Sequence, residues 1–239
     1  MKKVIIKTIL LILGIILLVG LVLGGIGYNT YKQALEEMPL NEKVEKIRKD
    51  KNYAKIEELP QIYIDAVIAV EDKRFYSHKG IDPISLGRAI VNDIKAMSFV
   101  EGGSTITQQL AKNIYFTQKK QIIRKVAEAF MSIEIEKNYD KNEILELYLN
   151  TSYFGDGCYT VKEAANHYFD KEPSEMTDYE ATLLAGIPNA PSVYAPTKNL
   201  ELAHKRQKQV LNKMIENGSL TEEEAEDIEN EAQNREEWR

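Results

Sequence analysis

The sequence predicts a mostly α-helical protein that begins with a membrane anchor. Strand patterns are almost absent, apolar residues recur at helical spacing, and the segment 8–31 carries no charged residue. The chain has 239 residues, of which 44% are hydrophobic and 28% charged, as in ordinary globular proteins. Its length allows one large domain or two small ones, and the segment 55–218 reads as one continuous domain.

The uncharged segment 8–31 consists mostly of Leu, Ile, Val and Gly. About twenty such residues in a helix cross the hydrocarbon core of a bilayer. Lys2, Lys3 and Lys7 precede it, so the positive-inside rule predicts a cytoplasmic N-terminus and a domain on the outer face. The alternative is a cleaved signal peptide, which requires a shorter apolar core and a small-x-small site. Gly24–Tyr28 is a poor cleavage site, which favours an uncleaved anchor.

The charge and the cysteine content exclude some classes of function. A net charge of −6 argues against a general nucleic-acid binder, because no basic surplus is present to neutralise phosphates. Cys158 is the only cysteine, so neither an internal disulfide nor a cysteine-based metal cluster can form.

Cap residues and apolar spacing predict the helices in order. The segment 32–59 is highly charged and is interpreted as a helical stalk or a mobile flap. Most of the helices that follow begin at a cap residue or a proline. They are expected over residues 60–70, 82–94, 104–112, 119–137, 140–149, 177–185 and 200–217, and from 221 onward.

The helix expected over 119–137 has an apolar stripe of Ile122, Val126, Ala129 and Ile133. Arg124 and Glu128 would lie on the opposite side. Taken alone, they would be a solvated ion pair that contributes a few tenths of a kcal/mol.

The segment Glu71–Gly80 follows the apolar run 62–70 and begins with two adjacent carboxylates. A buried helix that ends this way brings ionisable groups to the rim of a cleft, where burial raises a carboxyl pKa towards that of a working base. The plain alternative is a charged helix end that faces water. Further along, the turn Glu101–Thr105 ends in a plausible N-cap, and its Gly102 and Gly103 precede a helix whose N-terminal N–H groups could attract an anion.

Five stretches, in order, resemble one family, the peptidoglycan glycosyltransferases that polymerise lipid II. They are Glu71-Asp72…Phe75…His78…Gly80, Gly103–Gln109, Arg124-Lys125…Glu128, Lys141…Ile144-Leu145-Glu146…Tyr148-Leu149-Asn150, and Arg206…Val210-Leu211. The resemblance covers about residues 59–211. It implies a lysozyme-like helical domain with a smaller, membrane-proximal jaw lobe.

The resemblance also implies a domain plan and partners. The expected parts are a cytoplasmic N-terminus (1–7), a transmembrane anchor (8–31), a stalk or jaw segment (32–59), a glycosyltransferase domain (60–218) and an acidic C-terminal helix (219–239). The expected partners are lipid II, the growing glycan strand, the cell membrane and other wall-synthesis proteins, with no nucleic acid. The chain lacks Ser-x-x-Lys and Lys-Thr-Gly, so a monofunctional enzyme is expected, with a piece of a bifunctional parent as the alternative.

By resemblance, Glu71 is the general base and Glu128 the second essential glutamate, which orients cations or holds Mg²⁺ or Mn²⁺. No cofactor is expected to be obligatory. The pyrophosphate would be bound by Lys112, Arg124 and Lys125 with help from Ser104, and by Lys119 or Lys120, where relatives often carry arginine. Other substrate contacts are expected from Asp72, Phe75, His78, Thr105, Gln108, Gln109 and Asn113, with a capping or packing role left open for His78. Structural support is expected from Gly80, Gly103, Glu146, Tyr148, Asn150 and Arg206.

Two other classes of function stay open. A lysozyme-like or lytic enzyme would use Glu71 as an acid on a glycosidic oxygen, but it has no need of cations gathered for a diphosphate. A membrane-anchored scaffold that has lost activity would have no need of both Glu71 and Glu128.

Overall fold

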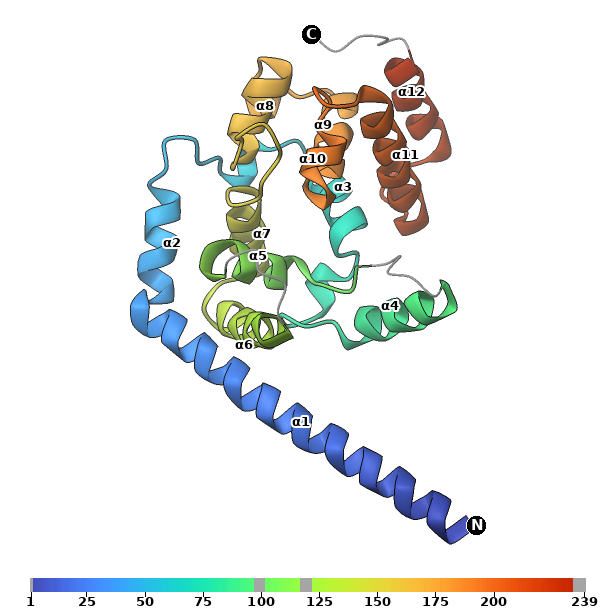
Figure 1. Cartoon of the computed structure of the whole chain (residues 1–239). Coiled ribbons are helices and arrows are strands. Elements are labelled where there is room, and N and C mark those ends of the chain that lie inside the picture. The colour runs from blue at the N-terminus through green and yellow to red at the C-terminus, as the bar shows by residue number, and fades with distance from the viewer. Residues whose placement is uncertain (1, 97–101, 117–121, 234–239) are drawn as a thin grey trace.

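The computed structural model describes residues 2–96, 102–116 and 122–233, and these contain helices but no strand (Figure 1). The predicted helical fold class is therefore confirmed. The α-helices are α1 (Lys2–Glu37), α2 (Leu40–Arg48), α3 (Gln61–Glu71), α4 (Pro83–Ala96), α5 (Ile106–Tyr115), α6 (Ile122–Asn138), α7 (Lys141–Leu149), α8 (Val161–Phe169), α9 (Asp178–Gly186), α10 (Pro191–Tyr194), α11 (Leu200–Asn217) and α12 (Glu222–Gln233). Short 3₁₀ helices are η1 (Ile56–Glu58), η2 (Phe75–Ser77), η3 (Pro173–Glu175) and η4 (Ile187–Asn189).

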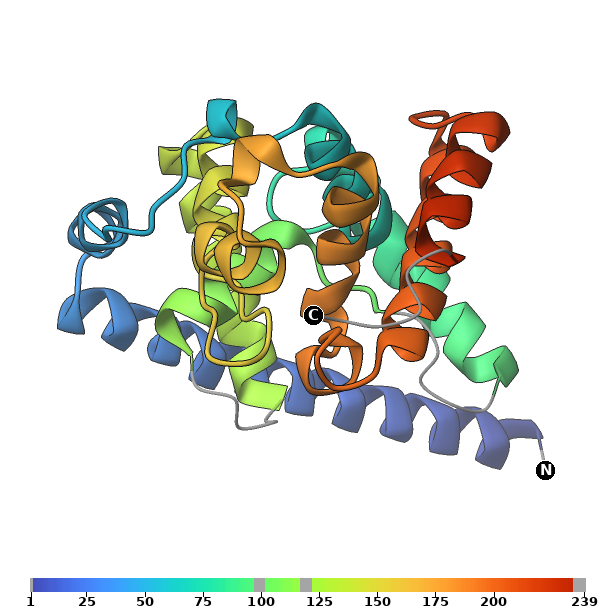
Figure 2. The ribbon, with the colours of Figure 1, turned by 90° about the horizontal axis from the view of Figure 1, so that it is seen from above.

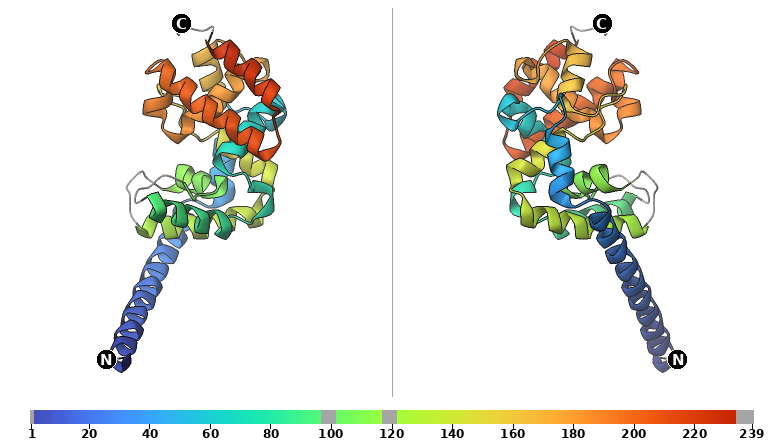
Figure 3. Two further views of the ribbon diagram at one scale, coloured as in Figure 1. Left: turned by 90° about the vertical axis from the view of Figure 1, so that its right-hand side faces the viewer. Right: turned by 90° about the vertical axis from the view of Figure 1, so that its left-hand side faces the viewer.

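The helices form two layers above a projecting α1 (Figures 1 and 3). Helices α4, α5 and α6 lie next to α1, whereas α8 to α12 lie farther away, and α3 and α7 run between the layers (Figure 3). Helix α3 packs on α9 and α11, and α5 packs on α6 and α7. The end of α3 is therefore held between the layers. Figure 2 shows α1 extending beneath the domain.

Helix α1 is long and apolar enough to span a membrane over Lys3–Glu37. Its C-terminal part is fixed to α6, where Tyr28 and Tyr31 contact Phe130 with ring centroids 5.3 and 6.1 Å apart. Gly27 is required at the crossing, because an added Cβ would lie 2.5 Å from Cγ1 of Val126. This contact joins the apolar helix directly to α6.

The stalk interpretation of the segment 32–59 needs revision. Helix α1 continues through residue 31 to Glu37, and α2 follows after a short break. Leu40 and Val44 of α2 are buried in the core. The segment is thus an integral part of the fold, while the domain boundaries stay predictions.

The predicted apolar stripe of α6 is not its core-facing side. Ile122 is 70% exposed and Ile133 is 37% exposed, whereas Ala127 and Met131 are fully buried. Helical spacing identifies which residues share a face of the helix, but not which element packs against that face. Here Val126 of the predicted stripe packs against Gly27 of α1. Helix α4 likewise exposes Ile84, Leu86 and Val91. Exposed apolar side chains thus occur on the layer beside α1.

Candidate active site

A cleft of about 1070 Å³ opens between the two layers. The end of α3 and the start of α5 form its floor, and α4, α6, η4 and α11 contribute the walls. Of the residues selected from sequence, eleven line it: Glu71, Asp72, Gly103, Ser104, Thr105, Gln108, Gln109, Lys112, Lys125, Glu128 and Arg206. Gly103 and Arg206 were expected only as structural support.

Glu71 is the last residue of α3, and its two carboxylate oxygens differ in their hydrogen bonding. Its Oε2 accepts a hydrogen bond of 2.7 Å from Nε2 of Gln109. Its Oε1 is buried and has no hydrogen-bond partner among the described residues. Burial raises the pKa of this carboxyl, and the Gln109 hydrogen bond and the charges of Arg206 and Lys112 oppose that rise. Glu71 therefore has one oxygen fixed and one available to take a proton.

Gln109 is oriented by a buried tyrosine from α7. The hydroxyl of Tyr148 donates to Oε1 of Gln109 at 3.4 Å, which leaves the amide NH₂ to face Glu71. Tyr148 is 1% exposed, and burial raises its pKa well above the ordinary value, so it stays a donor. The support role predicted for Tyr148 thus has a specific geometric basis.

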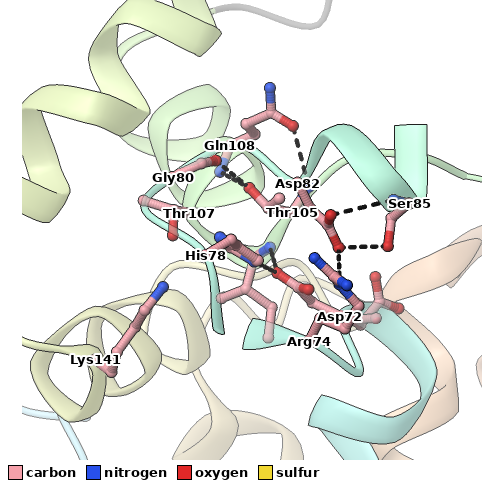
Figure 4. Close-up of polar contacts among 12 residues, drawn as sticks. Asp72, Arg74, His78, Gly80, Asp82, Ser85, Thr105, Thr107, Gln108 and Lys141 are labelled. Atoms are coloured by element: carbon pink, nitrogen blue, oxygen red, sulfur yellow. Dashed lines mark hydrogen bonds and ion pairs between the residues drawn. The ribbon is translucent and has the colours of Figure 1, made fainter. Parts of the chain in front are cut away.

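Asp72 and His78 connect the end of α3 to the start of α5 (Figure 4). One carboxylate oxygen of Asp72 contacts Nε2 of His78 at 2.8 Å and accepts the N–H of Ile106 at 3.0 Å. A second connection is made by Thr105, whose hydroxyl donates to the carbonyl of Gly80 at 2.6 Å. Gly80 has a φ of +87° and lies against the backbone of Ser132, so a side chain there would collide.

Some residues selected from sequence lie outside the cleft lining. His78 is buried beside Asp72, and Phe75 is fully buried beneath the ammonium of Lys141, 4.4 Å from its ring centroid. Asn113 is exposed on α5. Direct substrate contacts by His78, Phe75 and Asn113 stay predictions, and the geometry of His78 and Phe75 is that of packing groups. Arg124 does not line the cleft either, but it contacts Glu128, which does, so its pyrophosphate contact also stays a prediction. Lys119 and Lys120 lie outside the described residues.

Most backbone N–H groups at the N-terminus of α5 are hydrogen-bonded by side chains of the protein itself. Thr105 is its N-cap and forms a capping box with Gln108. The N–H of Ile106 is held by Asp72, and the hydroxyl of Ser104 accepts a 2.6 Å hydrogen bond from Nζ of Lys125. The backbone donors expected to attract an anion are thus mostly engaged, and anion binding here depends on side-chain cations.

Those cations gather around Glu128, which is 1% exposed on α6. Nε of Arg124 lies 2.9 Å from Oε1 of Glu128, and Nζ of Lys125 lies 3.0 Å from Oε2. Lys112 faces them from α5, and burial and the two neighbouring cations lower its pKa, while Glu128 opposes that shift. The carboxylate of Glu128 therefore holds two of these three cations, Arg124 and Lys125.

The donor set at Glu128 does not fit a divalent metal. Both of its oxygens are paired with cations. The part of the chain that the structure describes contains no group of three or more His, Cys, Asp or Glu residues that could hold a metal.

The remaining support residues position α7. Glu146 accepts from the N–H of Ile56 at 2.8 Å and from the hydroxyl of Tyr53. Asn150 exchanges hydrogen bonds with the backbone of Ala54, at 2.8 and 2.7 Å. The chain before α3 is thereby tied to the helix that carries Tyr148. Gly103 packs closely on α4, where an added Cβ would lie 3.2 Å from Cβ of Ala89.

Sequence analysis missed several groups in the cleft wall. They are Lys73, Ser85, Arg88, Asn92, Asn189, Gln209, Lys213 and Glu216. One signal was available, because Arg206, Gln209 and Lys213 follow the i, i+3, i+7 spacing of one helix face. The members on α4 and η4 had no comparable pattern.

Comparison with known proteins identifies the family of this chain. The model of the family described as Transglycosylase matches residues 38–215. The chain belongs to the transglycosylase family. Penicillin-binding protein 1F of Bacillus subtilis (strain 168) is 47% identical over 170 residues, covering 71% of this chain and 24% of the relative. Penicillin-binding protein 1A of Aquifex aeolicus (strain VF5) is 44% identical over 178 residues, covering 74% of this chain and 24% of the relative.

This transglycosylase chain spans about a quarter of the length of those curated relatives, at 24% of each. A crystal structure of penicillin-binding protein 1A from Haemophilus influenzae aligns with a TM-score of 0.46 and 24% identity, over 75% of this chain and 17% of that one. The family match confirms the resemblance and the predicted enzyme class, a glycosyltransferase.

Proposed function

We propose that this transglycosylase polymerises lipid II into β-1,4-linked glycan strands and releases undecaprenyl diphosphate. The observation that carries the proposal is the buried, partnerless Oε1 of Glu71 in a cleft that Lys112 and Lys125 also line. A base beside cations suits a reaction in which a hydroxyl loses a proton and a diphosphate departs.

The proton step uses Glu71. Its Oε1 takes the proton of the 4-hydroxyl of the acceptor's N-acetylglucosamine, and that oxygen attacks C1 of the donor's N-acetylmuramic acid. A new C–O bond forms while the bond from C1 to the diphosphate breaks, with the electron pair leaving on the phosphate oxygen. A single displacement inverts the α-linked diphosphate to a β-glycoside. The raised pKa of Glu71 makes it a stronger base than an exposed glutamate.

The leaving group needs positive charge rather than a proton, because a diphosphate departs as an anion. Lys112, Arg124 and Lys125 supply it, and Glu128 holds two of them in place. In this role Glu128 fixes cations and transfers no proton. Any Mg²⁺ or Mn²⁺ would enter with the diphosphate.

The anchor places the site at the substrate. Helix α1 spans the membrane with its N-terminus in the cytoplasm, and the cleft lies on the outer face, where lipid-linked substrates and the growing strand are held. Exposed apolar side chains on α4 and α6 lie in the layer beside α1 (Figure 3). Tethering enzyme and lipid to one surface raises their effective concentration. Other wall-building proteins would act at the same surface.

A polymerisation assay tests the function. The protein in detergent or liposomes is given lipid II with Mg²⁺ or with EDTA, and products are resolved by length. We expect glycan strands with Mg²⁺ and with EDTA. EDTA should change the rate only by removing metal ions bound to the diphosphate. Preformed strands form a second arm, in which a lytic enzyme would shorten them. Lipid II that stays monomeric in every condition would favour the inactive scaffold and contradict the proposal.

A further inference from the structure

Arg206 is a cation of the cleft wall whose contacts are all neutral. Its Nη1 donates to Oε1 of Gln209 at 2.9 Å, and its Nε lies 3.4 Å from the carbonyl oxygen of Gly186. Its guanidinium carbon lies 5.8 Å from the ring centroid of Tyr194. Among the described residues, no carboxylate lies within ion-pair distance of Arg206, whereas Arg124 and Lys125 share Glu128.

The fold makes room for this arginine. At Gly186, where α9 ends, an added Cβ would lie 2.9 Å from Cγ of Arg206. The absence of that side chain lets the stem of Arg206 lie against the backbone, and the half-buried guanidinium is held by three groups of no net charge. Partial burial of a cation without a counterion is unfavourable. Such an arrangement is useful where a ligand supplies the anion.

Arg206 lines the cleft from a different helix layer than Lys125 of α6. Helix α11 lies in the upper part of Figure 1, α5 and α6 lie in the lower part, and α3 ends between them. Arg206 and Lys112 line the same cleft as Glu71, and their charges oppose the rise of the Glu71 pKa that burial causes. Two separate cationic positions therefore flank the base.

The proposed reaction joins two molecules that each carry a diphosphate. One diphosphate leaves, and the other stays on the acceptor. Two such anions repel each other, which favours a separate cationic position for each. We propose that Arg206 binds the diphosphate of the acceptor lipid, while Lys112, Arg124 and Lys125 receive the diphosphate that leaves the donor. This inference rests on the proposed function, and it replaces a purely structural role for Arg206. A guanidinium matches phosphate oxygens in a bidentate fork.

The first experiment measures binding of the acceptor lipid separately from binding of the donor. Lipid II at varied concentration is added to a saturating, preformed lipid-linked tetrasaccharide diphosphate, and single additions are counted. Arg206→Gln should raise KM for lipid II about ten- to a hundredfold, as expected for loss of a charge-assisted phosphate contact, and should change kcat less. Arg206→Lys should recover part of the affinity. Lys208→Gln, on the same helix and paired only with Glu229 on the surface, is the matched control.

Binding identifies the group that Arg206 recognises. The probes, added to protein carrying Glu71→Gln, are lipid II, a peptide-free lipid-linked disaccharide diphosphate, and the disaccharide peptide as a methyl glycoside. Adding Arg206→Gln should weaken binding of the two diphosphate probes and leave the glycoside unchanged. An equal loss of affinity for all three probes would show that Arg206 has a structural role. A loss of affinity only for the probes that carry the peptide would show that Arg206 binds the peptide carboxylates. Either result overturns the inference. Wild-type protein that fails to polymerise lipid II would instead contradict the proposed function.

Discussion

Two glutamates of the cleft, Glu71 and Glu128, have the same side chain in opposite surroundings. Glu71 has one hydrogen bond, from a neutral amide, and a buried oxygen with no partner in the described part of the chain. Glu128 has an ion pair on each oxygen. The first carboxylate has room for a proton, whereas the second is occupied by positive charge. Chemical role is therefore set by neighbours rather than by residue type.

The two sites also differ in what fixes them. Gln109 holds Glu71, and Tyr148 orients Gln109 from another helix. Glu128 is held by residues three and four positions earlier on its own helix. The base thus depends on the packing of α3, α5 and α7, while the cation site is largely local to α6. The predictions below test this difference.

Replacement of the base should have the largest effect. Glu71→Gln removes the proton acceptor and keeps the shape, so we expect polymerisation to fall about 10²- to 10⁴-fold. Binding of lipid II should persist. Glu45→Gln, on the surface of α2, is the control and should keep the wild-type rate. A Glu71→Gln enzyme with more than half of wild-type activity would show that the base is elsewhere.

Replacement of the second glutamate should cost less and leave a different signature. Glu128→Gln releases Arg124 and Lys125 from their fixed positions, and we expect about a hundredfold lower kcat, comparable to the loss of one preorganised charge-stabilising group. The acidic limb of the pH–rate profile should stay where it is in the wild type, because Glu71 is unchanged. If that limb disappeared, Glu128 would be the titrating base.

Removal of the Gln109 amide should move the acidic limb itself. The hydrogen bond from Gln109 lowers the pKa of Glu71, so Gln109→Leu should raise that pKa further. The rate should fall about tenfold at mildly acidic pH and recover as the pH rises, as expected for one hydrogen bond to a charged group. The pH dependence of kcat measures this, and a uniform loss at every pH would instead indicate general damage to the cleft.

The sequence was sufficient for the parts of the fold with local causes. The apolar run of α1 and the capping boxes at Thr105, Asp140 and Thr177 need only neighbouring residues, and all appear in the structure. The direction in which α6 faces was not predictable, because it depends on the contact of Gly27 with Val126, far apart in the chain.

The site shows the same division. Glu71 and Glu128 were found through motifs, whereas the packing of Phe75 depends on Lys141, far along the chain. His78 is paired with Asp72, which also accepts the N–H of Ile106 at the start of α5. The position of Arg206 in the cleft wall depends on the crossing of α9 and α11 at Gly186. Spacing on α11 could have placed Arg206 and Gln209 on a shared face, but not shown which neighbour that face meets.

The smallest predicted effect concerns stability and has opposite signs at the two glutamates. Burial raises the folded-state pKa of Glu71 above its unfolded value, so its contribution to stability is present below the unfolded pKa, about 4.3, and is lost as the pH rises through the folded pKa. Glu71→Gln should therefore melt at a higher temperature than wild type at pH 8, with the gain vanishing near pH 4. Glu128→Gln should melt lower at pH 8, because Arg124 and Lys125 lose their shared partner. Thermal melts at both pH values test this, and a Glu71→Gln gain of equal size at pH 4 and pH 8 would show that the ionised carboxylate is not the cause.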